Sequence, residues 1–334
     1  MTNFSIDQEL FSNVLQQHIP VIPSRSTLPI LNSMRWQITG DKLLIHSTDL
    51  EISLITISEV HSDEDGEAAV PARKVADIVR ELPPEQINIT LDESYRVNIN
   101  SANGVYKIAG SNPDDFPAMP SSDTLDEIII PSSKFKRMVN HASFSVSKDD
   151  LRPTLCGVYF QVFKDEYRMV STDGHRLSKI VDFSGRYDGE PFNMIIPLKG
   201  LNLSARTLAD NIDLTISRSK NFMKISSEEG DIYSRLIEGK YPLYENVIPK
   251  GNPNIMTANV ENMMSTVRRV AIFSSSISHQ VRFQISAEKA VITAEDVDIG
   301  GEAQEKIKGD YQGEDILIGY NANYLIDALR QIGT

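Results

Sequence analysis

The sequence has one cysteine, Cys156, among 334 residues, so it can form no internal disulfide and no cysteine metal site. It has no apolar run near the ~20 residues that a membrane-spanning helix needs. Its first residues, MTNFSIDQEL, lack the basic and apolar regions of an export signal. We therefore expect a cytoplasmic protein with no membrane partner.

The common catalytic and cofactor motifs are also missing. We find no P-loop, GxGxxG, HExxH, GxSxG or CxxC pattern, and the histidines show no metal-ligand spacing. The Asp63-x-Asp65-Gly66 run begins like a calcium loop, but Lys74 occupies the twelfth position, where a glutamate is needed. We predict no metal, no cofactor and no catalytic residue.

The formal net charge of −13 argues against a protein that grips nucleic acid, because phosphates are contacted mostly by clustered Lys and Arg. The acids are unevenly spread, however. Three stretches without Asp or Glu (128–147, 193–209 and 262–287) carry Lys134, Lys136 and Arg137; Lys199 and Arg206; and Arg268, Arg269 and Arg282. This distribution predicts a basic surface on an acidic body, with phosphate contact but no base reading. Taken alone, it is more typical of solvated helix faces.

A repeat is the strongest feature of the sequence. Three segments each combine a β-prone run, a Pro or Gly break and a short amphipathic helix. Their apolar positions are Val75, Ile78, Val79 and Leu82; Leu201, Ala205 and Leu208; and Leu325, Ala328, Leu329 and Ile332. Each copy also has an earlier helical segment. Its equivalent apolar positions are Leu10 and Val14 in the first copy, Phe135 and Val139 in the second, and Met263 and Val267 in the third. Chance alignment is the weaker explanation, because several landmarks recur in order at nearly constant spacing.

The repeat predicts an α+β protein of three similar domains, each with two short helices packed on antiparallel β-sheet. Alternating strands such as 42–46, 167–171 and 290–293 lie between the helices. We place the domains at residues 1–123, 127–250 and 254–334, with joints near Pro120 to Asp126 and Pro249 to Pro253. Because the third copy stops at Thr334, directly after its second helix, we expect its final strands to be missing.

The segment from Ser171 to Leu177 is the most distinctive motif. Asp173-Gly174 between two strand-like runs is typical of a two-residue hairpin, and a plain tight turn is the simplest interpretation. An enzyme could instead use Asp173 to orient His175, or pair Cys156 with His175 as nucleophile and base. Cys156 follows Leu155 in a β-prone run, which favours a buried structural thiol.

Six motifs, in order along the whole chain, resemble the bacterial beta sliding clamp family, the beta subunit of DNA polymerase III. They are Thr27-Leu-Pro-Ile-Leu31, Thr48-Asp-Leu-Glu51, Val70-Pro-Ala-Arg-Lys74, Asp115-Phe-Pro117, Thr172-Asp-Gly-His-Arg-Leu177 and Tyr241-Pro242. The resemblance implies the DNA clamp fold and a non-catalytic processivity factor. It also implies a head-to-tail homodimeric ring that slides on double-stranded DNA, a clamp loader that opens it, and a pocket for the polymerase alpha subunit and other clamp-binding-motif proteins.

The resemblance also implies site residues. The DNA-contacting positions are Arg25, Arg73, Lys148, Asp149, Arg152, Pro153, Thr154 and, on charge, Lys199. The peptide-binding pocket is Leu155, Thr172, Gly174, His175, Arg176, Leu177, Pro242 and Val247. The dimer contact is Lys74, Tyr106 and Ile108 against Ile272 and Phe273. The sequence departs from the family pattern at Pro153 and Thr154, where enterobacterial members have aromatics, and at Asn246, where some relatives have a basic residue. It also lacks the family's C-terminal Met-Pro-Met-Arg-like segment. A β-rich scaffold built from repeats and, more distantly, a hydrolase using Cys156 or His175 are the alternatives.

Overall fold

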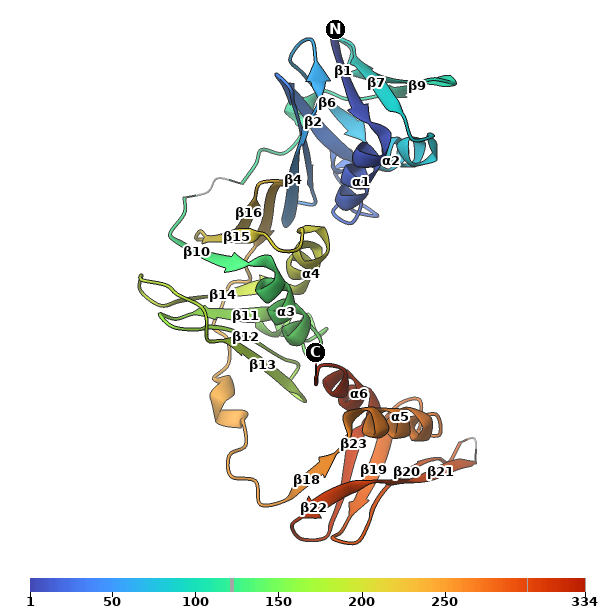
Figure 1. Ribbon diagram of the computed structural model, residues 1–334, viewed down its shortest axis with the longest axis vertical. Coiled ribbons are helices and arrows are strands. Elements are labelled where there is room, and N and C mark those ends of the chain that lie inside the picture. The colour runs from blue at the N-terminus through green and yellow to red at the C-terminus, as the bar shows by residue number, and fades with distance from the viewer. Residues whose placement is uncertain (121–122, 299, 334) are drawn as a thin grey trace. The chain divides into compact units, whose positions relative to one another are not determined.

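The computed structural model describes residues 1–120, 123–298 and 300–333. The chain divides into two compact units, Met1–Lys240 and Tyr241–Thr334, which are taken separately below. Short helices pack on antiparallel sheets in both units (Figure 1). The predicted α+β class is confirmed, and the described residues contain the six predicted amphipathic helices. The three domain boundaries stay a prediction.

The first unit contains two copies of the repeat. The first copy comprises β1 (Thr2–Asp7), α1 (Gln8–His18), β2 (Ser33–Thr39), β3 (Lys42–Thr48), β4 (Ile52–Glu59), β5 (His61–Ser62), β6 (Gly66–Pro71), α2 (Ala72–Glu81), β7 (Gln86–Leu91), β8 (Arg96–Ser101) and β9 (Gly104–Ala109). The second comprises β10 (Asp126–Pro131), α3 (Ser132–Ser143), β11 (Gly157–Val162), β12 (Tyr167–Thr172), β13 (Leu177–Asp182), β14 (Phe192–Pro197), α4 (Leu198–Thr207), β15 (Asp213–Arg218), β16 (Phe222–Ser227) and β17 (Gly230–Arg235).

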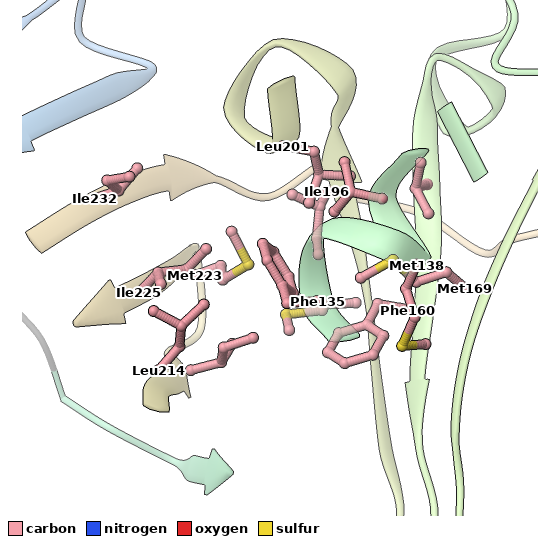
Figure 2. Close-up of a cluster of buried hydrophobic side chains, with 14 of the residues drawn as sticks. Phe135, Met138, Phe160, Met169, Ile196, Leu201, Leu214, Met223, Ile225 and Ile232 are labelled. Carbon is pink, nitrogen blue, oxygen red and sulfur yellow. The ribbon is translucent and has the colours of Figure 1, made fainter. Parts of the chain in front are cut away.

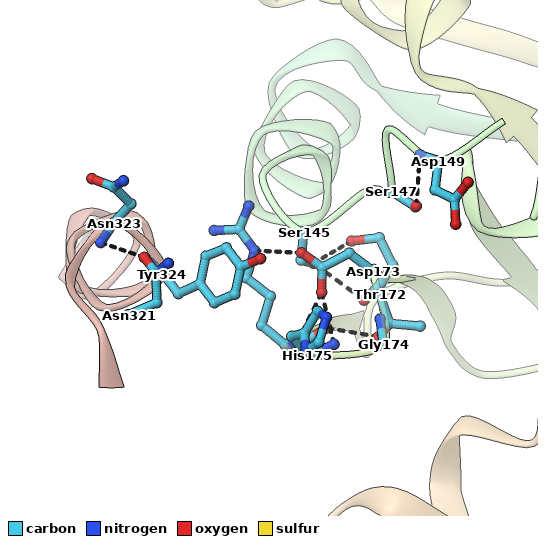
Figure 3. A network of polar contacts seen from close by, with 12 residues as sticks. Ser145, Ser147, Asp149, Thr172, Asp173, Gly174, His175, Asn321, Asn323 and Tyr324 are labelled. Carbon is cyan, nitrogen blue, oxygen red and sulfur yellow. Dashed lines mark hydrogen bonds and ion pairs between the residues drawn. The ribbon is translucent and has the colours of Figure 1, made fainter. Parts of the chain in front are cut away.

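The second unit holds the third copy. It comprises β18 (Ile255–Ala258), α5 (Val260–Ala271), β19 (Gln280–Ile285), β20 (Ala290–Asp296), β21 (Gly301–Ile307), β22 (Gly309–Gln312), β23 (Ile316–Asn321) and α6 (Ala322–Arg330). Side-chain caps begin its helices: Asn259 accepts from the N–H of Asn262 at 2.9 Å, and Asn321 accepts from that of Asn323 at 2.9 Å (Figure 3). Such caps satisfy backbone donors that a helix N-terminus would otherwise leave unpaired.

Each copy has its own hydrophobic core between helices and sheet. In the second copy, Phe135 and Met138 of α3 meet Phe160 and Met169 of the sheet, with Leu201 of α4 nearby (Figure 2). Helix periodicity places Phe135, Met138 and Val139 on one face of α3. The apolar stripe seen in the sequence is therefore the face that packs against the sheet.

The two copies of the first unit are joined by one sheet. Its strand order is β10-β15-β16-β17-β4-β3-β2-β6, so β17 of the second copy pairs with β4 of the first. Ile232 lies opposite Leu54, and Val21, Ile52 and Leu54 of the first copy are buried in the core of the second. The joint is thus both a backbone ladder and an apolar contact.

Candidate functional site

Arg25 and Arg73 are both exposed cations of the first unit. Arg25 is exposed in the loop that follows α1, and Arg73 is exposed in the first turn of α2. The guanidinium of Arg73 donates to the carbonyl oxygen of Ile22 at 3.2 Å. Because Ile22 precedes Arg25 by three residues, this hydrogen bond ties Arg73 to the loop that carries Arg25. That both residues contact DNA phosphates stays a prediction.

Lys199, at the start of α4, has an intramolecular partner. Its ammonium forms an ion pair with Asp49, whose other carboxylate oxygen accepts from the N–H groups of Glu51 and Ile52 at 3.0 and 2.8 Å. Lys199 is exposed to salt, but the side chain of Asp49 is only 11% exposed, so salt screens this pair only in part. Lys199 therefore offers a partly compensated charge beside the joint between the two copies.

The loop from Lys148 to Thr154 is held by its own aspartate. Asp149 accepts from the N–H of Leu151 at 3.1 Å and from the guanidinium of Arg152 at 2.9 Å. These two contacts hold the pKa of the Asp149 carboxyl below its ordinary value. Lys148 stays exposed, and Pro153 and Thr154 form a short 3-10 turn (Pro153–Leu155). Leu151, which the sequence analysis did not single out, is 90% exposed at the tip.

Cys156 differs from its prediction. It ends the 3-10 turn rather than lying in a strand, and it is partly exposed rather than buried. Its thiol donates to the carbonyl oxygen of Asp149 at 3.3 Å. Partial burial, together with the carboxylates of Asp150 and Asp149, raises the pKa of the thiol. A protonated thiol facing carbonyl oxygens is a poor nucleophile, which argues against the hydrolase.

The turn between β12 and β13 is longer than the predicted two-residue hairpin. Thr172 pairs with Leu177, which leaves four residues between the strands. Asp173 explains the extra length, because it accepts from the N–H groups of His175 and Arg176 at 2.9 and 3.0 Å (Figure 3). Burial opposes ionisation of Asp173, but these donors and the Arg176 guanidinium together hold its pKa below the ordinary value.

Five of the predicted pocket residues, between Thr172 and Leu177, form this turn, whereas Leu155 is buried at the end of the Pro153–Leu155 turn. The hydroxyl of Thr172 accepts from the N–H of Gly174 at 3.0 Å, and Arg176 lies over the ring of Phe144 at 5.4 Å. A Cβ added at Gly174, where φ is +91°, would lie 3.0 Å from the Arg152 guanidinium. The turn therefore contacts the 148–154 loop, and exposed His175 projects from its tip.

Pro242 and Val247 belong to the second unit. Both are exposed: Pro242 lies two residues before the short 3-10 turn η4 (Tyr244–Val247), and Val247 is its last residue. The neighbouring Leu243 is also largely exposed, although the sequence analysis did not select it. Three exposed apolar side chains within six residues are typical of a segment that contacts a partner.

The predicted dimer contacts lie at sheet and helix ends. β9 is the edge strand of the sheet β5-β1-β7-β8-β9; on it Val105 and Tyr106 are exposed, whereas Ile108 is buried in the core of its own copy. Ile108 therefore anchors β9 rather than presenting a surface. Lys74 is exposed on α2. In the second unit, Ile272 and Phe273 are exposed where α5 ends.

Two kinds of feature are absent from the part of the chain that the structure describes. Among residues 1–120, 123–298 and 300–333, no three His, Cys, Asp or Glu side chains gather in a way that could hold a metal ion. Within the same ranges, no helix has the length and apolar character needed to cross a membrane.

Comparison with known proteins shows the family of the chain. Models of the DNA polymerase III beta subunit match the chain as its N-terminal domain at residues 2–120, central domain at 129–243 and C-terminal domain at 245–334. A beta sliding clamp of Pseudomonas putida is 31% identical over 331 residues, covering 98% of this chain and 89% of the relative.

Solved structures agree. A DNA polymerase sliding clamp from Pseudomonas aeruginosa superposes with a TM-score of 0.93 at 29% identity, covering 100% of this chain and 91% of that one. A sliding clamp from the same organism bound to griselimycin gives 0.95 at 29% identity, with 100% and 90% coverage. The predicted clamp fold and resemblance are confirmed. The chain belongs to the beta sliding clamp family, the beta subunit of bacterial DNA polymerase III, a family of non-catalytic processivity factors of DNA replication.

Proposed function

We propose that two copies of this chain form a head-to-tail ring around double-stranded DNA and tether the replicative polymerase to it. The joint inside the first unit is the observation that carries the proposal. There, β17 pairs with β4 and buries Val21, Ile52 and Leu54. A repeat protein can use the same joint between copies, provided that the equivalent strand edges and apolar side chains are free.

The strand edges and apolar side chains that correspond to the β17–β4 joint support a second joint of this kind between copies. α1 and α5 align by their caps, Asp7 and Asn259, so exposed Phe273 corresponds to buried Val21. β9 corresponds to β17, and both β9 and β21 are edge strands within their own units. We set the register of the proposed β9–β21 pairing from the side chains that face the core. Tyr106 of β9 then corresponds to Ile232 of β17, and Ala303 of β21 corresponds to Leu54 of β4.

This register makes a specific contact between copies. With Tyr106 of one copy opposite Ala303 of the other, antiparallel pairing sets Lys107 opposite Glu302. Opposite charges directly across two strands stabilise their pairing. Val105, Lys107 and Glu302 therefore join the predicted interface of Lys74, Tyr106, Ile272 and Phe273.

The DNA contacts proposed are Arg25, Arg73, Lys148 and Arg152, with Lys199 weaker because of its pairing with Asp49. Their side chains offer charge and no rigid base-reading element, which supports binding to phosphates of any sequence. Asp149, Pro153 and Thr154 shape the loop that presents Lys148 and Arg152. Salt should weaken all these contacts.

The turn at 172–177, with Leu155, is the proposed contact for short hydrophobic peptides of the polymerase alpha subunit, the clamp loader and other clamp-binding-motif proteins. Pro242 and Val247, on the second unit, are also proposed to contact such peptides. A relative from P. aeruginosa was solved with griselimycin bound, which supports a ligand-binding surface in the family. These partners imply a cytoplasmic location.

Retention on circular DNA tests the ring. The protein is loaded by a clamp loader onto nicked circular DNA, and retention is followed at rising salt before and after the circle is linearised. A ring stays bound to the circle and slides off the linear form. Equal retention on both would contradict topological binding and favour the repeat scaffold. Light scattering at micromolar concentration checks the dimer, and a Thr172→Ala, His175→Ala double variant checks peptide binding without affecting retention.

A further inference from the structure

The first strand of each repeat (β1, β10 and β18) differs in whether a short strand pairs with its outer edge. In the first copy, β5 pairs with β1, with Ser5 opposite His61. In the third, β22 pairs antiparallel with β18, with Thr257 opposite Asp310. The equivalent strand of the second copy is β10, which pairs only with β15 and ends its eight-stranded sheet (Figure 1). Of the three repeats, the second therefore lacks the short strand that would cover the outer edge of its first strand, β10.

The segment that would supply this strand is held elsewhere. In every copy it lies between the third and fourth strands of the sheet, here residues 183–191. The hydroxyl of Tyr167 donates to the carbonyl oxygen of Arg186 at 2.7 Å, and the N–H of Tyr187 donates to that of Lys164 at 3.0 Å. These bonds attach the segment to the β11–β12 hairpin, while the hydroxyl of Tyr187 donates to the carboxylate of Asp126, the first residue of β10, at 2.7 Å. No residue in it forms a strand.

A groove of about 670 Å³ results. It is lined by residues 127–131 of β10 on one side and by residues 184–189 on the other, with Lys134, Tyr167 and Asp182. Ile129 is 64% exposed, whereas Ile128 and Ile130 on either side are buried in the core. Five strand residues span about 17 Å, enough for an extended peptide of similar length.

The backbone of β10 has hydrogen-bonding groups for such a peptide. The N–H of Ser132 donates to the carbonyl oxygen of Ile212 on the β15 side. Because antiparallel strands alternate the direction of these groups, Ile129 directs its N–H and carbonyl outward. Pro131 fits the same alternation, since proline is tolerated where the missing N–H would face away from the sheet.

The side chains of the groove indicate the chemistry of its occupant. One carboxylate oxygen of Asp182 is buried without a hydrogen-bond partner, and buried polar atoms are rarely left so. The groove carries three carboxylates, on Glu127, Asp182 and Asp188, against the cations Lys134 and Arg186. An occupant should therefore carry a hydrogen-bond donor and no net negative charge.

We propose that the groove beside β10 binds an extended, neutral or basic peptide segment of a partner protein by strand addition. The peptide runs antiparallel to β10, as β5 and β22 run to their partners. An apolar side chain covers Ile129, and a hydroxyl, amide or ammonium group donates to Asp182. The site lies wholly in the second repeat, so it does not depend on ring closure.

A designed peptide tests strand addition in the full chain. The probe is acetyl-Lys-Val-Ser-Val-Ser-Val-Lys-amide, titrated to roughly 5 mM, and the readout is the methyl NMR signals of Ile128, Ile129 and Ile130. The matched control has the same side chains but N-methyl groups on alternate residues, which remove its backbone donors. We expect the probe to shift the β10 signals and the control to bind at least tenfold more weakly.

Two variants locate the binding. Ile129→Pro removes the outward N–H and should abolish it, whereas Ile129→Thr keeps the N–H and should retain most of it. Asp182→Asn should weaken it several-fold. If Ile129→Pro fails to fold, the N-methylated peptide still tests whether binding requires backbone hydrogen bonds. The proposal is overturned if the β10 signals do not move, if both peptides bind equally, or if the shifts appear only at residues 172–177.

Discussion

Two buried histidines should make the first repeat sensitive to mild acid. His18 and His46 are almost fully buried. The His18 ring nitrogens lie 2.7 Å from the hydroxyl of Ser47 and 2.9 Å from that of Thr56, and His46 packs edge-on against Phe116. Burial, with a smaller effect of His46, lowers the pKa of His18 to about 3; burial, with Arg35, lowers that of His46 to about 4. Both side chains are therefore neutral in the folded protein.

The sign of the effect follows from proton uptake. In the unfolded chain both histidines return to a pKa of 6.5, so they gain protons on unfolding at any pH between about 4 and 6.5. Stability is fully present above this window and is lost as the pH falls through it. At about pH 5 each histidine removes about 2 kcal/mol, or about 4 kcal/mol together. That is a large part of the roughly 5–15 kcal/mol that stabilises a typical domain.

Fluorescence of Trp36, the one tryptophan, isolates this repeat because its ring is buried in the same core. We expect the urea midpoint to fall by roughly 1–4 M between about pH 7.5 and pH 5. The pH dependence should be about halved in His18→Gln and unchanged in His61→Gln, since His61 is exposed. A midpoint that stays constant over this range, or a full pH dependence in His18→Gln, would refute the reasoning.

Three other perturbations follow from the packing and the charges. Phe135→Ala removes a fully buried ring and should cost about 3–5 kcal/mol, seen as a lower thermal midpoint; a loss under about 1 kcal/mol would mean that the core collapses around the gap. Lys107→Glu should weaken the dimer in sedimentation analysis, and adding Glu302→Lys should restore it, each charge pair contributing about 0.2–1 kcal/mol; no rescue would reject the proposed register. Arg73→Ala should lower affinity for DNA equally across sequences and reduce the slope of affinity against salt by about 1; an unchanged slope would remove Arg73 from the DNA surface.

The helices and the fold class could be predicted because their signal is local. Apolar residues at helical spacing, such as Val75 and Val79, became the buried face of α2. The length of the β12–β13 turn could not be predicted from Asp173-Gly174 alone, because the two hydrogen bonds that Asp173 accepts set it. The exposure of Cys156 depends on the preceding 3-10 turn, which a β-prone composition does not indicate.

The site residues likewise include some that local motifs identify and others that depend on contacts between distant segments. Motifs identified Arg25 and Arg73, but the hydrogen bond that ties Arg73 to the loop after α1 joins it to Ile22, 51 residues away in the sequence. Pairing between distant segments also gave Lys199 its partner, Asp49. The open edge of β10 has no local signal at all. It emerges only when the three repeats are compared as sheets and one lacks a strand.

The shared sheet of the first unit also constrains how the chain is made. β4 finds its neighbour β17 only after about 180 more residues have been synthesised, since Leu54 lies opposite Ile232. At about 5–20 residues per second, the ribosome needs roughly 10–40 s for that stretch. Until then the nascent first repeat presents an open strand edge with Ile52 and Leu54 uncovered, the kind of surface that pairs with other chains. Synthesis rate and chaperone protection over this interval should therefore govern the yield of folded protein more than the stability of the finished molecule does.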